Sequence, residues 1–293
     1  MNYVVVIPAH NEEESLSALL KSLCDQTHLP QQVVLVNDNS TDATAQIMHD
    51  FAEKHSFISY VNYNSSEEHL PGEKVIKAFN YGKSFLQPSY DAIAKLDADL
   101  ILPTNYFEEV LEALLQEKTG IAGGFCYEKS IHGKWVKKHP MHEDHVRGAF
   151  KTYRKDCFEA IGGLRSAMGW DTVDELLARF NDFRVQTLAH LKVKHIRPLG
   201  VNYSHSAAKK QGRAFYQMRY GSLLSLIAGL KSGRQKKSLL WLTGIILGYF
   251  NAMVKRLPYF VSKEEGRFIR QLRWEQIRAR KNHVLKTKTK TKG

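Results

Sequence analysis

Runs of apolar, often β-branched residues alternate with amphipathic segments along the first two-thirds of the chain. The runs predict buried strands at residues 3–8, 33–36, 58–63, 90–96, 121–127 and 186–195. Between them, apolar residues at helical spacing predict helices at about 12–24, 41–54, 72–85, 105–115, 150–161 and 171–180. Strands that alternate with helices of this length predict an α/β fold with right-handed βαβ units and a mostly parallel sheet.

Polar side chains follow three of the predicted strands at the points where these strands end. They are His10, Asn11 and Glu12 after the first, Asn37 and Asp38 after the second, and Asp97 and Asp99 after the fourth. Because the carboxyl ends of parallel strands lie at one edge of a sheet, we expect these residues to form one site. An isolated Asp-x-Asp also suits a solvated acidic turn, so the prediction depends on all three strand ends.

The spacing of Asp97 and Asp99 indicates a cation site. Alternate residues of an extended segment point to the same side, so the two carboxylates face one point and repel each other unless a cation lies between them. One or two carboxylates together with phosphate oxygens are the usual ligands of Mg²⁺, and similarly of Mn²⁺.

Charge is distributed unevenly over the 293 residues, whose net charge is +12. Residues 1–205 hold 21 Lys+Arg and 27 Asp+Glu, a net −6, and residues 206–293 hold 21 and 3, a net +18. The balance predicts an acidic catalytic part and a basic appendage that seeks a membrane surface or nucleic acid. Three widely spaced cysteines fit a reducing cytosol, and the start of the chain shows no signal peptide.

The appendage, residues 206–283, alternates basic patches with apolar helical runs. Its longest uncharged run, 238–254, lies between two basic pairs and would be roughly 25 Å long as a helix, shorter than the ~30 Å of a bilayer core. We keep three interpretations of this run: a helix buried against the catalytic domain, an in-plane interfacial helix, and a span. The Lys- and Thr-rich tail, 284–293, is predicted to be disordered.

Three motifs in order, Val4–Glu12 (VVVIPAHNE), Val36–Asp42 (VNDNSTD) and Leu96–Asp99 (LDAD), together with Gly162–Glu175, resemble the family-2 glycosyltransferases with the GT-A fold. The resemblance covers residues 1–205. It implies a Rossmann-like, mostly parallel sheet flanked by helices, here with a C-terminal helical appendage. It also implies an inverting enzyme that moves a sugar from a nucleotide-diphosphate sugar to a saccharide or lipid-linked acceptor, in cell-envelope polysaccharide or glycolipid synthesis.

The resemblance further implies roles for single residues. Nucleotide-sugar contacts fall to Pro8, Ala9, Glu12, Asp38, Lys74 and Asp97, and ligands of Mg²⁺ or Mn²⁺ to Asp97, Asp99 and His195. Arg197 is a further candidate for the diphosphate. Asn37 stands where many members of the family have an aspartate.

Inversion requires a carboxylate that takes the proton of the acceptor hydroxyl, on the face opposite the leaving diphosphate. The acidic residues in the matching segment are Asp171, Asp174 and Glu175. Any of them could be this base. We favour Asp171, which lies between a Gly-rich loop and the predicted helix. The same spacing also suits a helix-capping box. Residues 128–148, rich in histidine, are interpreted as an acceptor-side loop.

Two other functions remain open from the sequence. A nucleotidyltransferase on a related fold would be expected to carry a Gly-rich, basic signature after the first strand, where this chain has Pro8-Ala9-His10-Asn11-Glu12. A non-catalytic protein could bind a membrane or nucleic acid through its basic end, but that end has no recognisable nucleic-acid module. We therefore expect no nucleic-acid partner, and a cytoplasmic protein that lies peripherally at the inner, anionic face of the membrane. The donor sugar and the oligomeric state are left undetermined.

Overall fold

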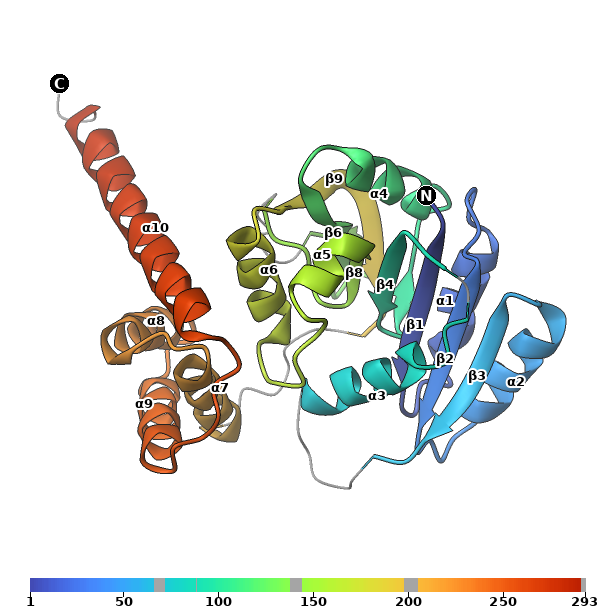
Figure 1. Cartoon of the computed structure of the whole chain (residues 1–293), viewed down its shortest axis with the longest axis horizontal. Helices are drawn as coiled ribbons and strands as arrows, with labels where there is room; N and C mark the ends of the chain where they lie inside the picture. Colours follow the sequence, from blue (N-terminus) through green and yellow to red (C-terminus); the bar gives the residue numbers. More distant parts are fainter. Residues whose placement is uncertain (66–71, 88, 138–143, 198–204, 291–293) are drawn as a thin grey trace. The chain divides into compact units, whose positions relative to one another are not determined.

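A mixed sheet forms the core of the N-terminal part of the chain (Figure 1). Its strands are β1 (Tyr3–Ala9), β2 (Gln32–Asp38), β3 (Ile58–Tyr63), β4 (Ala92–Leu96), β5 (Leu100–Ile101), β6 (Thr119–Lys129), β7 (Trp135–Val136), β8 (Phe150–Arg154) and β9 (Arg184–His195). They lie in the order β3-β2-β1-β4-β8-β6-β9-β5, and β7 pairs with β6. Strands β1 to β4 are parallel neighbours, and β8 runs antiparallel to β4 and β6. The predicted α/β fold with a mostly parallel sheet is confirmed.

This computed structural model describes residues 1–65, 72–87, 89–137, 144–197 and 205–290, with side chains to residue 279. The chain divides into two units, Met1–Val201 and Asn202–Gly293. The first unit contains α1 (Leu16–Cys24), α2 (Thr44–Lys54), α3 (Glu73–Lys83), α4 (Tyr106–Leu115), α5 (Lys155–Ala160) and α6 (Trp170–Phe180). The second contains α7 (His205–Gln217), α8 (Ser222–Gln235), α9 (Leu239–Val254) and α10 (Lys263–Lys290).

Burial explains why the first strands form where they do. Each residue of β1 is buried, and Val33 to Val36 of β2 are fully inaccessible to solvent. Helix α3 lies close over both strands at Gly82, where a Cβ atom would collide with side chains of Val6 and Val36. A fully apolar, β-branched strand fits this position because both of its faces are covered.

The helix predicted at 150–161 is wrong in its first half. Residues 150–154 form β8, in the middle of the sheet, and only the short α5 follows as a helix. Lys151 and Tyr153 are both buried in β8, and their polar atoms bind Asp174 of α6. A local pattern cannot show a partner more than twenty residues away.

The second unit is built from helices that approach one another at glycines. A Cβ atom on Gly212 of α7 would collide with the backbone of Ile245, and one on Gly248 of α9 would collide with the backbone of Lys209. Glycines four apart on one helix, here Gly244 and Gly248, allow two helix backbones to come this close. Helix α10 extends through Lys290, into the segment whose composition predicted disorder.

Candidate functional site

The loops that follow β1 and β2 are locked together by two asparagines. Asn11 and Asn39 both have a φ of 53°, a left-handed conformation that asparagine tolerates better than most residues. The side-chain oxygen of Asn11 accepts a hydrogen bond from the amide of Thr41 (2.8 Å), and the Asn11 amide donates to the Ser40 hydroxyl (3.1 Å). The two loops therefore form one rim of the sheet edge.

A pocket of about 710 Å³ opens at this edge, where β1, β2 and β4 end. Its lining includes each residue that was predicted to contact the donor or a metal: Pro8, Ala9, Glu12, Asp38, Lys74, Asp97, Asp99 and His195. Arg197 lines it too. The side chain of Asp38 is buried and accepts a hydrogen bond from the amide of Ser65 (3.2 Å). The structure thus brings together residues that are up to 189 positions apart in the sequence.

Strand pairing brings His195 to the two aspartates. In the antiparallel pair β5–β9, His195 lies opposite Leu100, and the amide of Ile196 donates to the backbone oxygen of Asp99 (2.8 Å). One ligand atom each from Asp97, Asp99 and His195 lie within 4.8 Å of one another. Carboxylate oxygens and an imidazole nitrogen at this separation form a donor set suited to Mn²⁺ or Mg²⁺.

The ring of His195 is held by a hydrogen bond to the backbone. Its Nδ1 lies 2.8 Å from the backbone oxygen of Arg197, to which it can donate a hydrogen bond, and 3.5 Å from a carboxylate oxygen of Asp99. That tautomer leaves a lone pair on Nε2, and this atom is buried without a hydrogen-bond partner among the residues that the structure describes. A histidine that donates one ring N–H to a carbonyl and keeps the other nitrogen bare is the usual arrangement at metal sites.

The two aspartates are only partly neutralised by the protein. Asp99 is 5% exposed, and burial together with the charge of Asp97 raises its pKa, although His195 acts in the opposite direction. Arg197 bridges the pocket, with its Nε 3.2 Å from a carboxylate oxygen of Asp99 and an ion pair to Glu12. A divalent cation would stabilise the charged form of Asp99 at this place.

Two buried lysines lie behind the pocket, and sequence reasoning missed both. Lys95 and Lys151 are register partners across the β4–β8 pair, and their ammonium groups lie 5.1 and 5.9 Å from the ring centre of Trp170. Lys95 forms an ion pair with Asp97 and donates to the backbone oxygen of Gly148 (3.2 Å). The only signal was a lysine inside an otherwise apolar strand.

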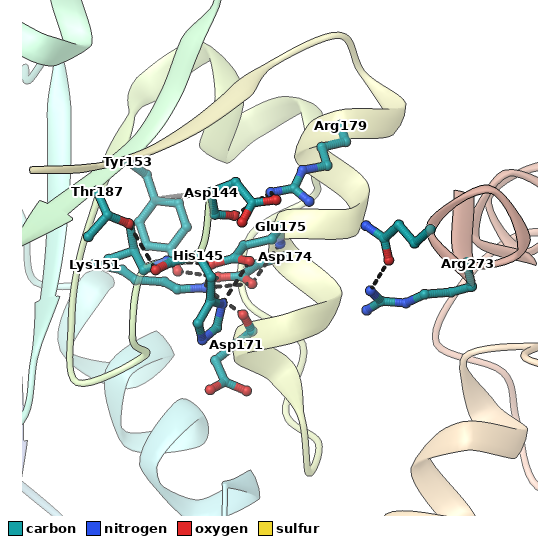
Figure 2. Close-up of polar contacts among 12 residues, drawn as sticks. Asp144, His145, Lys151, Tyr153, Asp171, Asp174, Glu175, Arg179, Thr187 and Arg273 are labelled. Carbon is teal, nitrogen blue, oxygen red and sulfur yellow. Dashed lines mark hydrogen bonds and ion pairs between the residues drawn. The ribbon is translucent and has the colours of Figure 1, made fainter. Parts of the chain in front are cut away.

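Lys151 is the centre of a closed acidic cluster with Asp174 and Glu175 (Figure 2). Its ammonium group lies 2.9 Å from both carboxylate oxygens of Asp174 and 3.0 Å from Glu175. Tyr153 donates a further hydrogen bond to Asp174 (2.5 Å). Glu175 also accepts hydrogen bonds from His145 (3.0 Å) and from the amide of Val146 (3.0 Å).

Burial and Lys151 act in opposite directions on this cluster. Burial raises the pKa of Asp174 to about 6, and Lys151 only partly offsets the effect. For Glu175 the burial effect is outweighed by Lys151 and by the hydrogen bond from His145, so its pKa is lowered. The pKa of Lys151 is raised because the three carboxylates around it overcome the effect of burial. Asp174 and Glu175 are therefore engaged inside the protein.

Asp171 is placed differently from the other two base candidates. Its backbone oxygen accepts a hydrogen bond from Lys151 (2.5 Å), and its carboxylate points away from the closed cluster (Figure 2). It is partly exposed, and a Cβ atom on Gly148 would lie 2.9 Å from its Cβ. Gly148 in turn accepts the hydrogen bond from Lys95, the partner of Asp97. Asp171 is thus connected to Asp97 through two residues, Gly148 and Lys95.

The alternative interpretation of Asp171 as part of a helix-capping box is not supported by the residues that the structure describes here. Helix α6 begins after Gly169, and no side chain caps it. Of the histidines in 128–148, His145 binds Glu175, whereas residues 138–143, with His139 and His142, lie outside the described residues.

Comparisons with known proteins identify the family and the fold. The family model described as Glycosyl transferase family 2 matches residues 4–168, more than half of the chain. A similar curated protein is the undecaprenyl-phosphate 4-deoxy-4-formamido-L-arabinose transferase of Edwardsiella ictaluri (strain 93-146), 32% identical over 121 residues that cover 37% of this chain and 32% of the relative. The probable glycosyltransferase YdaM of Bacillus subtilis (strain 168) is 36% identical over 98 residues, 32% of this chain and 22% of the relative. The chain spans about a third or less of the length of these relatives.

Two solved structures share the fold. TarS 1–349 of S. aureus, in complex with UDP-GlcNAc, has a TM-score of 0.55 at 17% identity, over 87% of this chain and 73% of that one. The mannosyltransferase PcManGT of Pyrobaculum calidifontis, in complex with GDP-Man and Mn²⁺, has a TM-score of 0.51 at 13% identity, over 94% and 80%.

Proposed function

This chain belongs to glycosyl transferase family 2, and we propose that it is an inverting enzyme that transfers a sugar from a nucleotide-diphosphate sugar to a saccharide or lipid-linked acceptor. One observation carries the proposal: the pocket at the ends of β1, β2 and β4 gathers the three motifs and a three-residue metal-ligand cluster. A donor in this pocket would have its nucleotide near Pro8, Ala9 and Asp38, and its diphosphate near Lys74 and Arg197.

Asp97, Asp99 and His195 would hold Mg²⁺ or Mn²⁺. The buried, unpartnered Nε2 of His195 and the raised pKa of Asp99 both fit a cation at this place. When bound, the ion neutralises the negative charge that develops on the leaving diphosphate. Arg197 and Lys74 add positive charge, and Glu12 holds Arg197 over the pocket.

Asp171 is the proposed catalytic base. Asp174 and Glu175 are bound to Lys151, so neither carboxylate is available to an acceptor hydroxyl without breaking a buried ion pair. Asp171 is held through its backbone by the same lysine, which leaves its carboxylate to take the proton. A carboxylate in this role contributes roughly 10²–10⁴ to the rate.

The names of relatives support the proposed acceptor class, and the charge of the second unit supports the location. Two of these relatives are named undecaprenyl-phosphate 4-deoxy-4-formamido-L-arabinose transferase, and undecaprenyl phosphate is a lipid. Residues 206–293 carry a net +18, which suits an anionic membrane surface. We propose a cytoplasmic enzyme that lies peripherally at the inner face of the membrane.

The proposal is tested by a thermal-shift screen against nucleoside diphosphates and nucleotide sugars, with and without Mn²⁺. We expect one nucleotide class to raise the melting temperature, and Mn²⁺ to increase that shift, because a ligand that binds only the folded state stabilises it. Asp99→Asn should remove the Mn²⁺ dependence and lower sugar transfer at least about a hundredfold. If no nucleotide shifts the melting temperature of the unaltered protein, the proposal fails.

A further inference from the structure

The second unit presents an apolar face to solvent. Leu223, Leu226 and Leu230 of α8 are 57, 40 and 50% exposed, and they repeat at the three- and four-residue spacing of a single helical stripe. Leu240, Leu247 and Val254 of α9 are 71, 54 and 76% exposed and lie seven residues apart. We call these six residues the outer face. A large apolar patch on a protein surface usually marks an interaction site.

The two stripes adjoin. Helices α8 and α9 pack against each other, and a shallow pocket of about 240 Å³ is lined by Leu223 and Leu226 from one and by Ile246 and Phe250 from the other. The pocket joins the exposed stripe of α8 to Phe250 of α9, which is 47% exposed and lies three residues after Leu247 and four before Val254, so that these side chains are neighbours on the helix surface.

The opposite side of α9 is already occupied. Trp241, Ile245 and Tyr249 are buried against α7, and the glycines between them let the two backbones come into contact. The helix carries no charged residue, yet only one side of it is buried in its own unit. This packing fixes which side of α9 remains outside.

Positive charge surrounds the outer face. The segment 206–262 contains ten Lys and Arg and no Asp or Glu. At the α8–α9 turn, Lys231, Arg234 and Lys237 line a pocket of about 920 Å³ together with Leu230 and Leu239. At the other end of α9, Lys255 and Arg256 are exposed.

We propose that the outer face is a docking surface for an anionic lipid bilayer, on which α8 and α9 lie in the plane of the membrane. Leucines at the centre enter the acyl boundary, and the cations meet lipid phosphates at both ends of α9. In a helix that lies flat, the cations at both ends reach the headgroup level of the same leaflet. No helix among the described residues is long and apolar enough to cross a bilayer.

The proposal deepens the peripheral location proposed above and names the surface that produces it. It also replaces the three interpretations of residues 238–254 with one two-sided helix. One side packs within the second unit and the other meets lipid. The segment 206–262 has no acidic side chains, which suits an anionic partner. The exposed leucines of the outer face favour lipid over nucleic acid or an acidic protein surface, because only lipid offers an apolar region that can bury them.

The test is flotation of the full chain with vesicles of phosphatidylcholine alone and of phosphatidylcholine with phosphatidylglycerol. We expect binding to the anionic vesicles that weakens at high salt. Leu240→Gln with Leu247→Gln should weaken it roughly a hundredfold. The matched control is Leu115→Gln with Ile131→Gln, two leucine-sized side chains that are 68 and 96% exposed on the first unit, and it should leave binding unchanged.

A second variant tests the charges. Replacing Lys231, Arg234 and Lys237 by Gln should lower binding to anionic vesicles by about a hundredfold at low salt, with little effect at high salt. Replacing Lys21, Lys54 and Lys192, exposed lysines of the first unit, removes the same charge and should have a small effect. Equal loss in both triple variants would mean that net charge alone drives binding, and would overturn the proposal.

Other occupants of the face give distinct results. If Leu240→Gln with Leu247→Gln lowers the melting temperature without lipid far more than its control does, the face packs within the chain. If it converts a dimer into a monomer, the face binds a second copy. Either result overturns the proposal. The nucleotide-dependent thermal shift, measured on the same variants, should not change, so loss of vesicle binding and failure of the transferase assignment are separate outcomes.

Discussion

The ligand cluster at the end of β4 and the acidic cluster at the start of α6 lie in the same unit, and each contains carboxylates next to a buried lysine. They differ in how far the protein balances their charge. Asp97 and Asp99 share Lys95 and the partly exposed Arg197, and they line a pocket. Asp174 and Glu175 are bound on several sides by Lys151 and its neighbours, and neither is among the residues that line this pocket.

The difference teaches which carboxylates can act on a ligand. A buried carboxylate whose oxygens are occupied by a lysine and a tyrosine holds the fold, whereas a carboxylate beside a bare histidine nitrogen can bind a cation. Asp171 lies between the two groups, because Lys151 holds its backbone and its carboxylate is left out of the cluster. The sequence motif alone gives no ranking of Asp171, Asp174 and Glu175.

The largest effect is expected from opening the closed cluster. Lys151→Met leaves Asp174 and Glu175 buried without their cation, and removing one partner of a buried ion pair destabilises by about 3–5 kcal/mol. The free energy of unfolding, measured with urea, reports the loss. Lys118→Met, which breaks the exposed pair Lys118–Asp182, is the control and should change stability by less than about 1 kcal/mol. Similar losses in both variants would mean that the cluster is not a closed structural unit.

The stability loss of Lys151→Met should depend on pH in a definite direction. Burial already raises the pKa of Asp174 to about 6 in the presence of Lys151, and without the cation it rises further. The folded Lys151→Met protein then holds a proton that its unfolded chain, with an ordinary aspartate pKa, has released. The difference in free energy of unfolding between the unaltered protein and the variant should therefore become smaller as the pH falls from 8 toward 5. A deficit that grows over this range would contradict the assignment.

The next effect concerns the carboxylate between the clusters. Asp171→Asn removes the proposed base but keeps the size of the side chain and its backbone hydrogen bond to Lys151. We expect kcat to fall roughly 10²–10⁴-fold while the nucleotide-dependent thermal shift is retained. Asp182→Asn, on an exposed aspartate of the same unit, is the control. Full activity of the Asp171 variant would return the role to Asp174 or Glu175.

A smaller effect is expected at the open cluster, by which we mean the ligand cluster of Asp97, Asp99 and His195. His195→Gln removes the bare Nε2 and should weaken the apparent affinity for Mn²⁺ at least about tenfold, measured as the Mn²⁺ concentration that gives half of the nucleotide-dependent shift. His190→Gln, on a histidine whose side chain is 62% exposed, should have no effect on that concentration. An unchanged Mn²⁺ requirement in both variants would remove His195 from the ligand set.

Much of the open cluster could be predicted from sequence because its residues follow strands that are visible as apolar runs. Runs of this kind end at polar residues, and parallel pairing then places the ends of β1, β2 and β4 at one edge. His195 was a candidate as the end of a predicted strand. Its position next to Asp99 depends on the antiparallel pair β5–β9. Strand β5 has only two residues, which is too short to give a recognisable pattern in the sequence.

The closed cluster could not be predicted for a related reason. Its central lysine, Lys151, lies on β8, in a segment that the sequence predicted to be a helix. Its register partner Lys95 lies on a strand more than fifty residues earlier. A lysine in a buried strand makes sense only when its carboxylate is known, and Asp174 is 23 residues away. Local periodicity records which side chains are polar but not which polar side chains are paired inside.

The smallest effect is expected where the closed cluster reaches solvent. The side chain of His145 is 39% exposed and donates to Glu175, so His145→Ala should lower the free energy of unfolding by about 1 kcal/mol or less. This hydrogen bond helps to lower the pKa of Glu175, so its contribution is present above the ordinary glutamate pKa and is lost as the pH falls below it. The difference between variant and unaltered protein should therefore disappear in acid. A larger loss than that of Lys151→Met would make His145, not the buried lysine, the group that holds the cluster closed.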